Sequence, residues 1–126
     1  MEVNSKFDHF NFNVSNLEKS LEFYAKALNL KEVRRYEPAD KSFTLAYLGD
    51  GKSDFVLELT CLKDHPQKYD LGENEIHLCV RVAGDYDEMR RFHKEMGVVC
   101  FENEVMNLYF IEDPDGYWIE VLPMKK

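Results

Sequence analysis

The feature that most constrains the fold of this chain is a weak internal repeat. Each half of its 126 residues begins with a strand-like segment that carries a histidine and ends with one that carries a glutamate. The first half runs from segment 7–14 to segment 55–60, and the second from 76–82 to 117–122. The two His-to-Glu separations are 49 and 43 residues. A repeat of this kind predicts two copies of one supersecondary unit.

Each half also carries the signals of one helix after its first strand. Ser15-x-x-Glu18 and Asp85-x-x-Glu88 are capping-box sequences, whose side chains satisfy free N–H groups of the first turn. Apolar residues then recur at helical spacing, and Gly97 stands where a left-handed residue ends a helix. The two apolar stripes consist of Leu17, Leu21, Tyr24 and Leu28, and of Tyr86, Met89, Phe92 and Met96.

Four further strands are predicted, at 32–36, 42–48, 98–104 and 108–111. Each half therefore has the order β-α-β-β-β. One face of such a sheet is covered by its helix and the other is bare, so a single unit cannot bury its apolar surface alone. We predict an α+β fold in which two tandem βαβββ modules form a curved mixed sheet around a metal-containing cavity. The alternative is a ferredoxin-like α+β sandwich without a functional pocket.

The segment between the two halves sets the expected domain organisation. It is polar and contains Pro66 and Gly72, and its length suits a link between two units. We expect one domain over residues 1–126, with module one at 7–62, a connector at 63–75 and module two at 76–123.

Strand alternation places a histidine or a glutamate opposite the apolar face of each terminal strand. In the first strand Phe10, Phe12 and Val14 share one side and His9 lies on the other; the same alternation isolates Glu58, His77 and Glu120. Two imidazoles and two carboxylates suit a divalent first-row metal and leave open positions on a six-coordinate ion. A single strand His or Glu is ordinarily solvated. The hypothesis of a metal site therefore depends on the repetition.

Charge and cysteine content exclude several classes of partner. The 24 acidic residues outnumber 16 Lys and Arg, which disfavours nucleic acid and anionic membranes. No apolar run is long enough to span a membrane, and the N-terminus lacks a secretory signal. Cys61, Cys79 and Cys100 are odd in number and widely spaced, so we expect reduced, mostly buried thiols. These observations predict a small cytoplasmic protein.

Several motifs recur in the order expected for one known family. They are Asp8-His9-Phe10, the helix segment 20–30 with its Phe23-Tyr24 pair, and segments 56–60, 76–80 and 112–121. Together they cover nearly the whole chain and resemble the vicinal-oxygen-chelate superfamily, within it the short bacterial glyoxalase I (lactoylglutathione lyase) type. The resemblance implies a homodimeric lyase that acts on a small molecule. It also implies a divalent metal, with nickel or cobalt favoured and zinc possible, held by His9, Glu58, His77 and Glu120.

The resemblance further implies the reaction. A glyoxalase I-like enzyme isomerises the hemithioacetal of methylglyoxal and a thiol, glutathione or another, to a hydroxyacyl thioester. Glu120 is the first candidate for the catalytic base and Glu58 the second. Two alternatives stay open. One is another metal-dependent isomerase, epimerase or thiol transferase acting on a small anion, and the other is a non-catalytic small-molecule binder.

The chain departs from the family at the positions that hold glutathione. Asn13 and Leu62 stand where family members carry an Arg and an Asn. Arg81 lies four residues after His77, in the place that corresponds to Asn13 in the other half. We therefore expect Arg81 and Asn13 to bind the substrate, with Arg81 at its anionic end. The alternative for Arg81 is a pair with a surface carboxylate.

Overall fold

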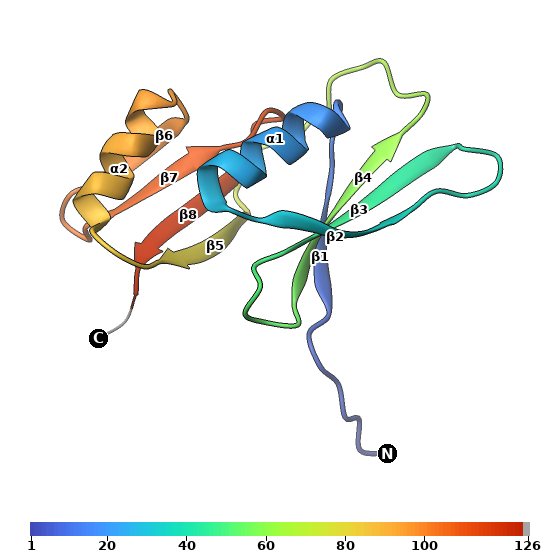
Figure 1. Cartoon of the computed structure of the whole chain (residues 1–126), viewed down its shortest axis with the longest axis horizontal. Helices are drawn as coiled ribbons and strands as arrows, with labels where there is room; N and C mark the ends of the chain where they lie inside the picture. Colours follow the sequence, from blue (N-terminus) through green and yellow to red (C-terminus); the bar gives the residue numbers. More distant parts are fainter. Residues whose placement is uncertain (125–126) are drawn as a thin grey trace. The chain divides into compact units, whose positions relative to one another are not determined.

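The structure, a computed structural model, describes residues 1–124 and contains two helices and eight strands in that range (Figure 1). The predicted order of elements, βαβββ twice, is confirmed. Strand and helix boundaries agree with the predicted ones to within a few residues. The elements are β1 (His9–Asn13), α1 (Leu17–Leu28), β2 (Lys31–Tyr36), β3 (Phe43–Gly49), β4 (Val56–Leu62), β5 (His77–Val82), α2 (Tyr86–Glu95), β6 (Val99–Asn103), β7 (Leu108–Glu112) and β8 (Trp118–Pro123).

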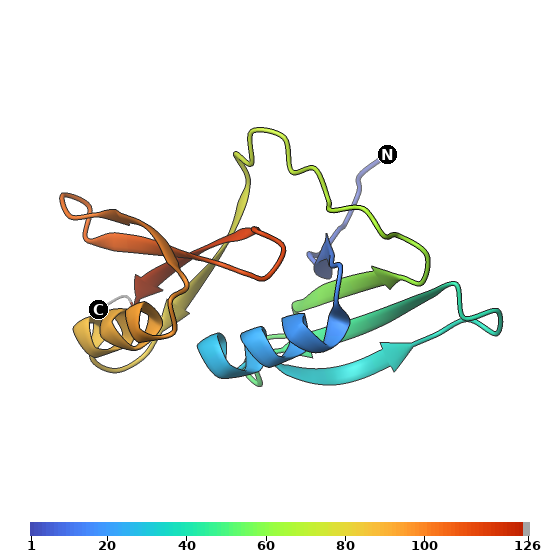
Figure 2. The same ribbon diagram turned by 90° about the horizontal axis from the view of Figure 1, so that it is seen from above.

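The chain divides into two compact units, residues 1–69 and the part from Asp70 onward. Each contains its own four-stranded sheet, with the order β1-β4-β3-β2 in the first and β5-β8-β7-β6 in the second. Figure 2 shows each sheet with its own helix. The α+β prediction is thus confirmed as two four-stranded mixed sheets, each with one parallel pair. The division at residue 69 lies inside the predicted connector; that residues 1–126 act as one domain stays a prediction.

The two sheets repeat one another in register as well as in order. The first strand of each unit runs parallel to its last strand, β1 beside β4 and β5 beside β8. In this pairing Asn11 lies opposite Glu58, and Cys79 lies opposite Glu120. In each unit the register partner of the glutamate is therefore the residue two positions after the histidine. This equivalence lets the two units be compared position by position.

The apolar faces of the terminal strands form the cores, as strand alternation predicts. Phe12, Val14, Leu57 and Leu59 in the first unit are at most 3% exposed. In the second unit Ile119 and Val121 are fully buried, as are Tyr109 and Ile111 of β7. Phe10, predicted on the same face as Phe12, is 40% exposed and lies near the start of β1.

The helix ends correct one prediction and confirm two. Asn16, not Ser15, caps α1: its side chain accepts a hydrogen bond from the Lys19 N–H, and the helix begins one residue later than the capping box placed it. Asp85 caps α2 as predicted, accepting from the Glu88 N–H. Gly97 has a φ of 75°, the left-handed value expected after a helix.

The buried faces of the helices differ from the predicted stripes. Of the α1 stripe only Tyr24 is buried, and in α2 the buried residue is His93, whose Nδ1 lies 2.8 Å from the Tyr109 hydroxyl. The apolar stripes did not predict the buried faces of α1 and α2, because small and polar side chains make up part of each buried face. The other buried residues of α1 are Ser20, Phe23 and Ala27.

The three cysteines are free, as expected, but the prediction that they are mostly buried is wrong. Cys79 is exposed, and Cys61 and Cys100 are intermediate. Cys79 and Cys100 lie on the edge strands β5 and β6, and Cys79 shares the face of His77. Within residues 1–124 neither helix has the length and apolarity required to cross a membrane.

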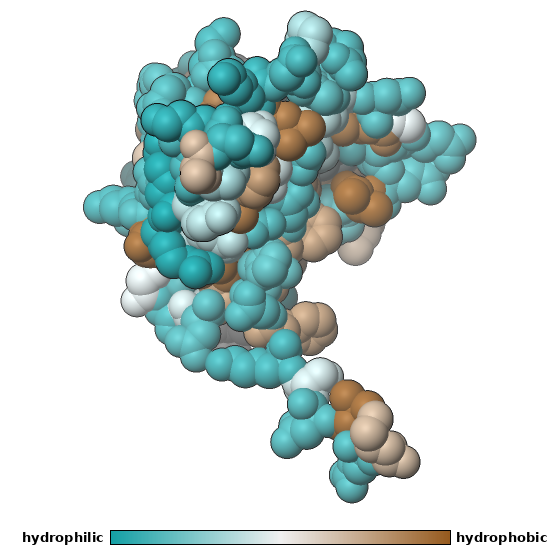
Figure 3. Space-filling view, turned by 90° about the vertical axis from the view of Figure 1, so that its right-hand side faces the viewer, coloured by the Kyte–Doolittle hydropathy of each residue, from teal (hydrophilic) through white to brown (hydrophobic). Residues whose placement is uncertain are grey.

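The segment before β1 extends away from the sheet of its unit (Figures 1 and 3). Its apolar side chains are solvent-exposed, with Phe7 at 90% and Val3 at 72%. Hydrophobic residues otherwise occur in Figure 3 as separate patches on a hydrophilic surface. The segment joins the sheet at Asp8 and His9, where the first candidate site residues lie.

Candidate metal centre

The first unit brings His9 and Glu58 together. His9 begins β1 and Glu58 lies in the middle of the adjacent β4. The distance from His9 Nε2 to Glu58 Oε1 is 3.6 Å. The imidazole is 39% exposed and the carboxylate 13%, so the histidine is open to solvent and the glutamate is mostly covered. The His9 and Tyr47 rings are perpendicular, with 6.2 Å between their centroids.

The second unit brings His77 and Glu120 together in the same way. His77 begins β5, Glu120 lies in the middle of β8, and His77 Nε2 is 3.3 Å from Glu120 Oε1. Their exposures, 44% and 16%, match those of the first pair. The His77 ring meets Phe110 edge-on, with centroids 5.0 Å apart. Of the four residues predicted to form one cluster, one His and one Glu thus lie together in each unit.

His9 is oriented by its neighbour in the sequence. Asp8 Oδ2 accepts a hydrogen bond of 2.6 Å from His9 Nδ1, which fixes the tautomer with the proton on Nδ1. Nε2, the nitrogen that faces Glu58, is then free to bind a metal. The same bond raises the pKa of His9 and lowers the pKa of Asp8. A carboxylate behind a histidine is the usual second partner of a metal-binding imidazole.

Glu58 is held by two polar side chains. With its amide nitrogen turned toward β4, Asn11 donates to Glu58 Oε1 at 3.1 Å and to Thr60 Oγ1 at 2.6 Å. The Tyr47 side chain, opposite Glu58 on β3, also hydrogen-bonds to the Glu58 carboxylate, which raises the pKa of Tyr47. Two donors from neighbouring strands therefore fix this carboxylate.

Glu120 has a different environment. Cys79 lies opposite it on β5, and burial, the charge of Glu120 and a hydrogen bond to the Glu120 carboxylate raise the pKa of this thiol to about 11. A thiol is a weak hydrogen-bond donor. On β7 the residue opposite Glu120 is Phe110, whose ring packs against Trp118 with centroids 5.3 Å apart. Glu120 therefore lies among aromatic rings and one neutral thiol.

The two predicted substrate-binding residues lie on the faces where alternation placed them. Asn13 is half-buried at the end of β1, and its side chain lies 2.8 Å from that of Asn11. Arg81 is exposed, and its Nη1 donates to the Pro123 carbonyl oxygen at 2.8 Å. Among residues 1–124 no carboxylate lies within ion-pair distance of Arg81, so it does not form the predicted alternative pair.

The donor set of each pair fits a divalent cation. Two ligand atoms at about 2.1 Å from one ion are separated by about 3.0–3.4 Å, close to the His–Glu distances of 3.6 and 3.3 Å. Imidazole and carboxylate are both ligands of first-row metals. In neither unit do three or more His, Cys, Asp or Glu side chains of residues 1–124 form a group that could hold a metal. Each unit thus offers one imidazole and one carboxylate.

Sequence reasoning missed the residues that orient these pairs. Asn11 could have been found, because alternation already placed it on the face of His9. Asp8 precedes His9 directly and could also have been suspected. Tyr47 could not, since its contact with Glu58 depends on the register between β3 and β4.

Comparisons with known proteins identify the family. Residues 6–121 match the Glyoxalase/Bleomycin resistance protein/Dioxygenase superfamily. The chain belongs to this superfamily. It is 40% identical to the lactoylglutathione lyase of Neisseria meningitidis, over 93% of this chain and 89% of that protein. It is 35% identical to a probable lactoylglutathione lyase of Synechocystis, over 90% and 92% of the two chains. These relatives confirm the prediction of a glyoxalase I-like enzyme of the lyase type.

Solved structures give the same fold. The trypanothione-dependent glyoxalase I of Leishmania major superposes with a TM-score of 0.81 at 30% identity, covering 95% of this chain and 87% of that one. Glyoxalase I of Zea mays gives a TM-score of 0.81 at 24% identity, covering 96% of this chain and 45% of that one. The second likeness concerns the fold alone.

Proposed function

We propose that this chain is a metal-dependent glyoxalase I-like lyase. It isomerises the hemithioacetal formed from methylglyoxal and a thiol to a hydroxyacyl thioester. The observation that carries the proposal is the repeated His–Glu pair, placed at equivalent registers of the two units. A structural role for one such pair would not require the second.

The metal is proposed to be held by His9 and Glu58 from the first unit and by His77 and Glu120 from the second. In the proposed homodimer a set of four ligands comes from one chain or is shared by two. Nickel or cobalt is the favoured ion, and zinc is possible. A bound divalent ion would supply electrostatic stabilisation of negative charge on the substrate oxygens.

The proton transfer is assigned to the glutamates. Glu120 takes the proton from the carbon that bears sulfur and hydroxyl, and returns it to the neighbouring carbonyl carbon, while the hydroxyl proton moves to the former carbonyl oxygen. Glu120 is favoured over Glu58 because its neighbours are a neutral thiol and aromatic rings. The Glu58 carboxylate accepts hydrogen bonds from Asn11 and Tyr47, and these bonds leave the carboxylate less free to move. Glu58 remains the second candidate.

Arg81 and Asn13 are proposed to bind the substrate, a small molecule. Arg81 uses one guanidinium N–H on a backbone carbonyl, and its remaining donors suit a carboxylate. The thiol carrier is glutathione or another low-molecular-weight thiol. The enzyme is proposed to act in the cytoplasm, as one domain spanning residues 1–126.

The decisive experiment measures thioester formation from methylglyoxal with glutathione and with other small thiols. Protein stripped with a chelator is compared with protein reloaded with Ni²⁺, Co²⁺ or Zn²⁺, and bound metal is counted by elemental analysis. We expect activity only in loaded protein, with one ion per set of four ligands. Thioester formation by none of the loaded forms with any thiol would refute the proposal.

A further inference from the structure

Arg34 of β2 lies on the same sheet face as the His9–Glu58 pair. Its guanidinium carbon is 4.0 Å from the centroid of the Tyr47 ring, and Tyr47 is its register partner on β3. Tyr47 in turn hydrogen-bonds to Glu58. The positive charge of Arg34 also acts on Asp8 and His9. Arg34 therefore borders the candidate metal centre, although it binds no atom of it.

A β-bulge in β2 places the Arg34 side chain on the sheet face of Glu58. The register of β2 shifts between Glu32 and Arg34, which lie opposite the consecutive residues Leu48 and Tyr47. Glu32 and Arg34 therefore lie on opposite faces, although residues two apart in a regular strand share one. Bulges of this kind often redirect a side chain next to an active site.

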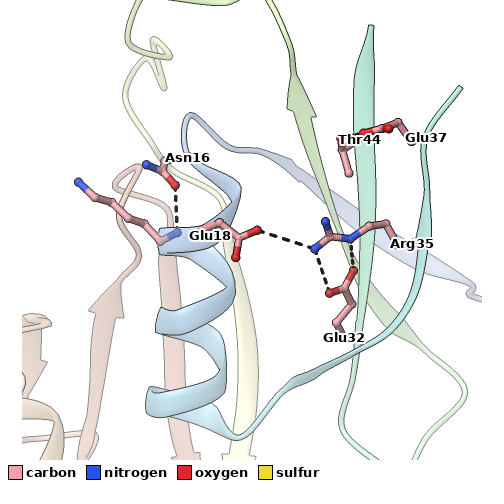
Figure 4. A network of polar contacts seen from close by, with 7 residues as sticks. Asn16, Glu18, Glu32, Arg35, Glu37 and Thr44 are labelled. Atoms are coloured by element: carbon pink, nitrogen blue, oxygen red, sulfur yellow. Dashed lines mark hydrogen bonds and ion pairs between the residues drawn. The ribbon is translucent and has the colours of Figure 1, made fainter. Parts of the chain in front are cut away.

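The neighbouring arginine shows the contrast. Arg35 points to the helix side and is paired, with Nε and Nη2 donating to the two oxygens of Glu32 at 2.6 and 3.0 Å. Its Nη2 also lies 4.0 Å from Glu18 of α1 (Figure 4). Arg35 is thus a structural residue that joins β2 to α1.

Arg34 has no such partner. Within residues 1–124 no carboxylate lies within ion-pair distance of its guanidinium, in a chain with 24 acidic residues. The Tyr47 ring packs against the guanidinium, 4.0 Å from its carbon, and the planar fork of an arginine suits a carboxylate that accepts two hydrogen bonds. The exposed position of Arg34 leaves its N–H groups accessible to a ligand.

We propose that Arg34 is a specificity residue that binds a carboxylate of the thiol part of the substrate. The inference rests on the proposed function, since the ligand is the thiol carrier of that reaction. Glutathione has two carboxylates, and Asn13 is neutral where an arginine is expected. Arg34 provides a cation on the face of the first unit, as Arg81 does on that of the second.

The test compares two unreactive ligands on Ni²⁺-loaded protein. S-methylglutathione carries both carboxylates, and its dimethyl ester carries neither. Binding is measured by titration calorimetry for wild type, Arg34→Met, Arg34→Lys and the control Arg35→Met. Methionine keeps the contact with the Tyr47 ring, so the loss of charge is separated from the loss of packing.

We expect Arg34→Met to weaken S-methylglutathione about ten- to hundredfold, the range for a charged hydrogen bond, and to leave the ester within about twofold. Arg34→Lys should lie between, and Arg35→Met should bind both ligands as wild type does. Equal weakening of both ligands, no weakening, or no binding of S-methylglutathione by wild type would each overturn the inference. If wild type forms the thioester but Arg34→Met binds S-methylglutathione as tightly as wild type, only the inference about Arg34 fails and the proposed function stands. Charge-dependent binding without any turnover overturns the function alone.

Discussion

The two units place the same His–Glu pair on two different surfaces. Equivalent positions around Glu58 and Glu120 are Asn11 and Cys79 on the first strand, and Tyr47 and Phe110 on the third. The first unit therefore surrounds its carboxylate with hydrogen-bond donors. The second surrounds it with rings and a thiol that stays protonated.

The two units also differ on their outer strands, β2 in the first unit and β6 in the second. Arg34 covers Tyr47 in the first unit, whereas at the equivalent place in the second Phe101 contacts both Phe110 and Trp118. Both outer strands carry a bulge just before this residue. The repeated backbone thus supplies equivalent registers, while the side chains make the face around Glu58 polar and the face around Glu120 mainly aromatic.

The largest effect is expected at the glutamates. Glu120→Gln removes the proposed base and should lower kcat by about 10²–10⁴-fold, the range for general base catalysis, in protein that still contains metal. Glu58→Gln, which alters a carboxylate already held by two donors, should lower kcat less. Steady-state kinetics with elemental analysis of each variant checks this. If Glu58→Gln showed the greater loss at equal metal content, the assignment of the base would be reversed.

A second prediction exchanges the two environments. Phe110→Tyr places a hydroxyl beside Glu120, where Tyr47 stands beside Glu58, and a hydrogen bond to a charged group stabilises it by about 1.5–3 kcal/mol. We expect kcat to fall about tenfold or more, because the base is then held in place. Tyr47→Phe, the matched change in the other unit, should alter kcat only a few-fold. Equal effects of the two substitutions would show that the donors around the carboxylates do not distinguish the units.

Much of the fold could be predicted because it follows from local patterns. Alternation in the first and last strands of each half predicted the buried faces of Phe12, Leu57 and Ile119, and the His–Glu pairs followed from the repeat. The start of α1 was misplaced because Ser15 and Asn16 are both cap residues, and only the backbone decides between them.

The rest of the site could not be predicted, since it depends on strand register and bulges. The direction of Arg34 follows from the bulge between Glu32 and Arg34, which strict alternation cannot foresee. The contact of Tyr47 with Glu58 needs the pairing of β3 with β4. The burial of His93 needs its partner Tyr109 on β7, 16 residues away in the sequence.

The smallest expected effect concerns the residues before the two histidines, Asp8 and Ile76. Asp8 holds the Nδ1 proton of His9, while Ile76 cannot do this for His77. Asp8→Asn should weaken metal binding about tenfold, the low end of the range for such partners, because the Asp8 side chain is 88% exposed. Asp54→Asn is the matched control, since Asp54 is equally exposed and pairs with Lys6 instead. Competition with a metal-binding dye measures both affinities. If the two variants bound metal equally well, His9 would not need its carboxylate, and the two histidines would be equivalent despite their different neighbours.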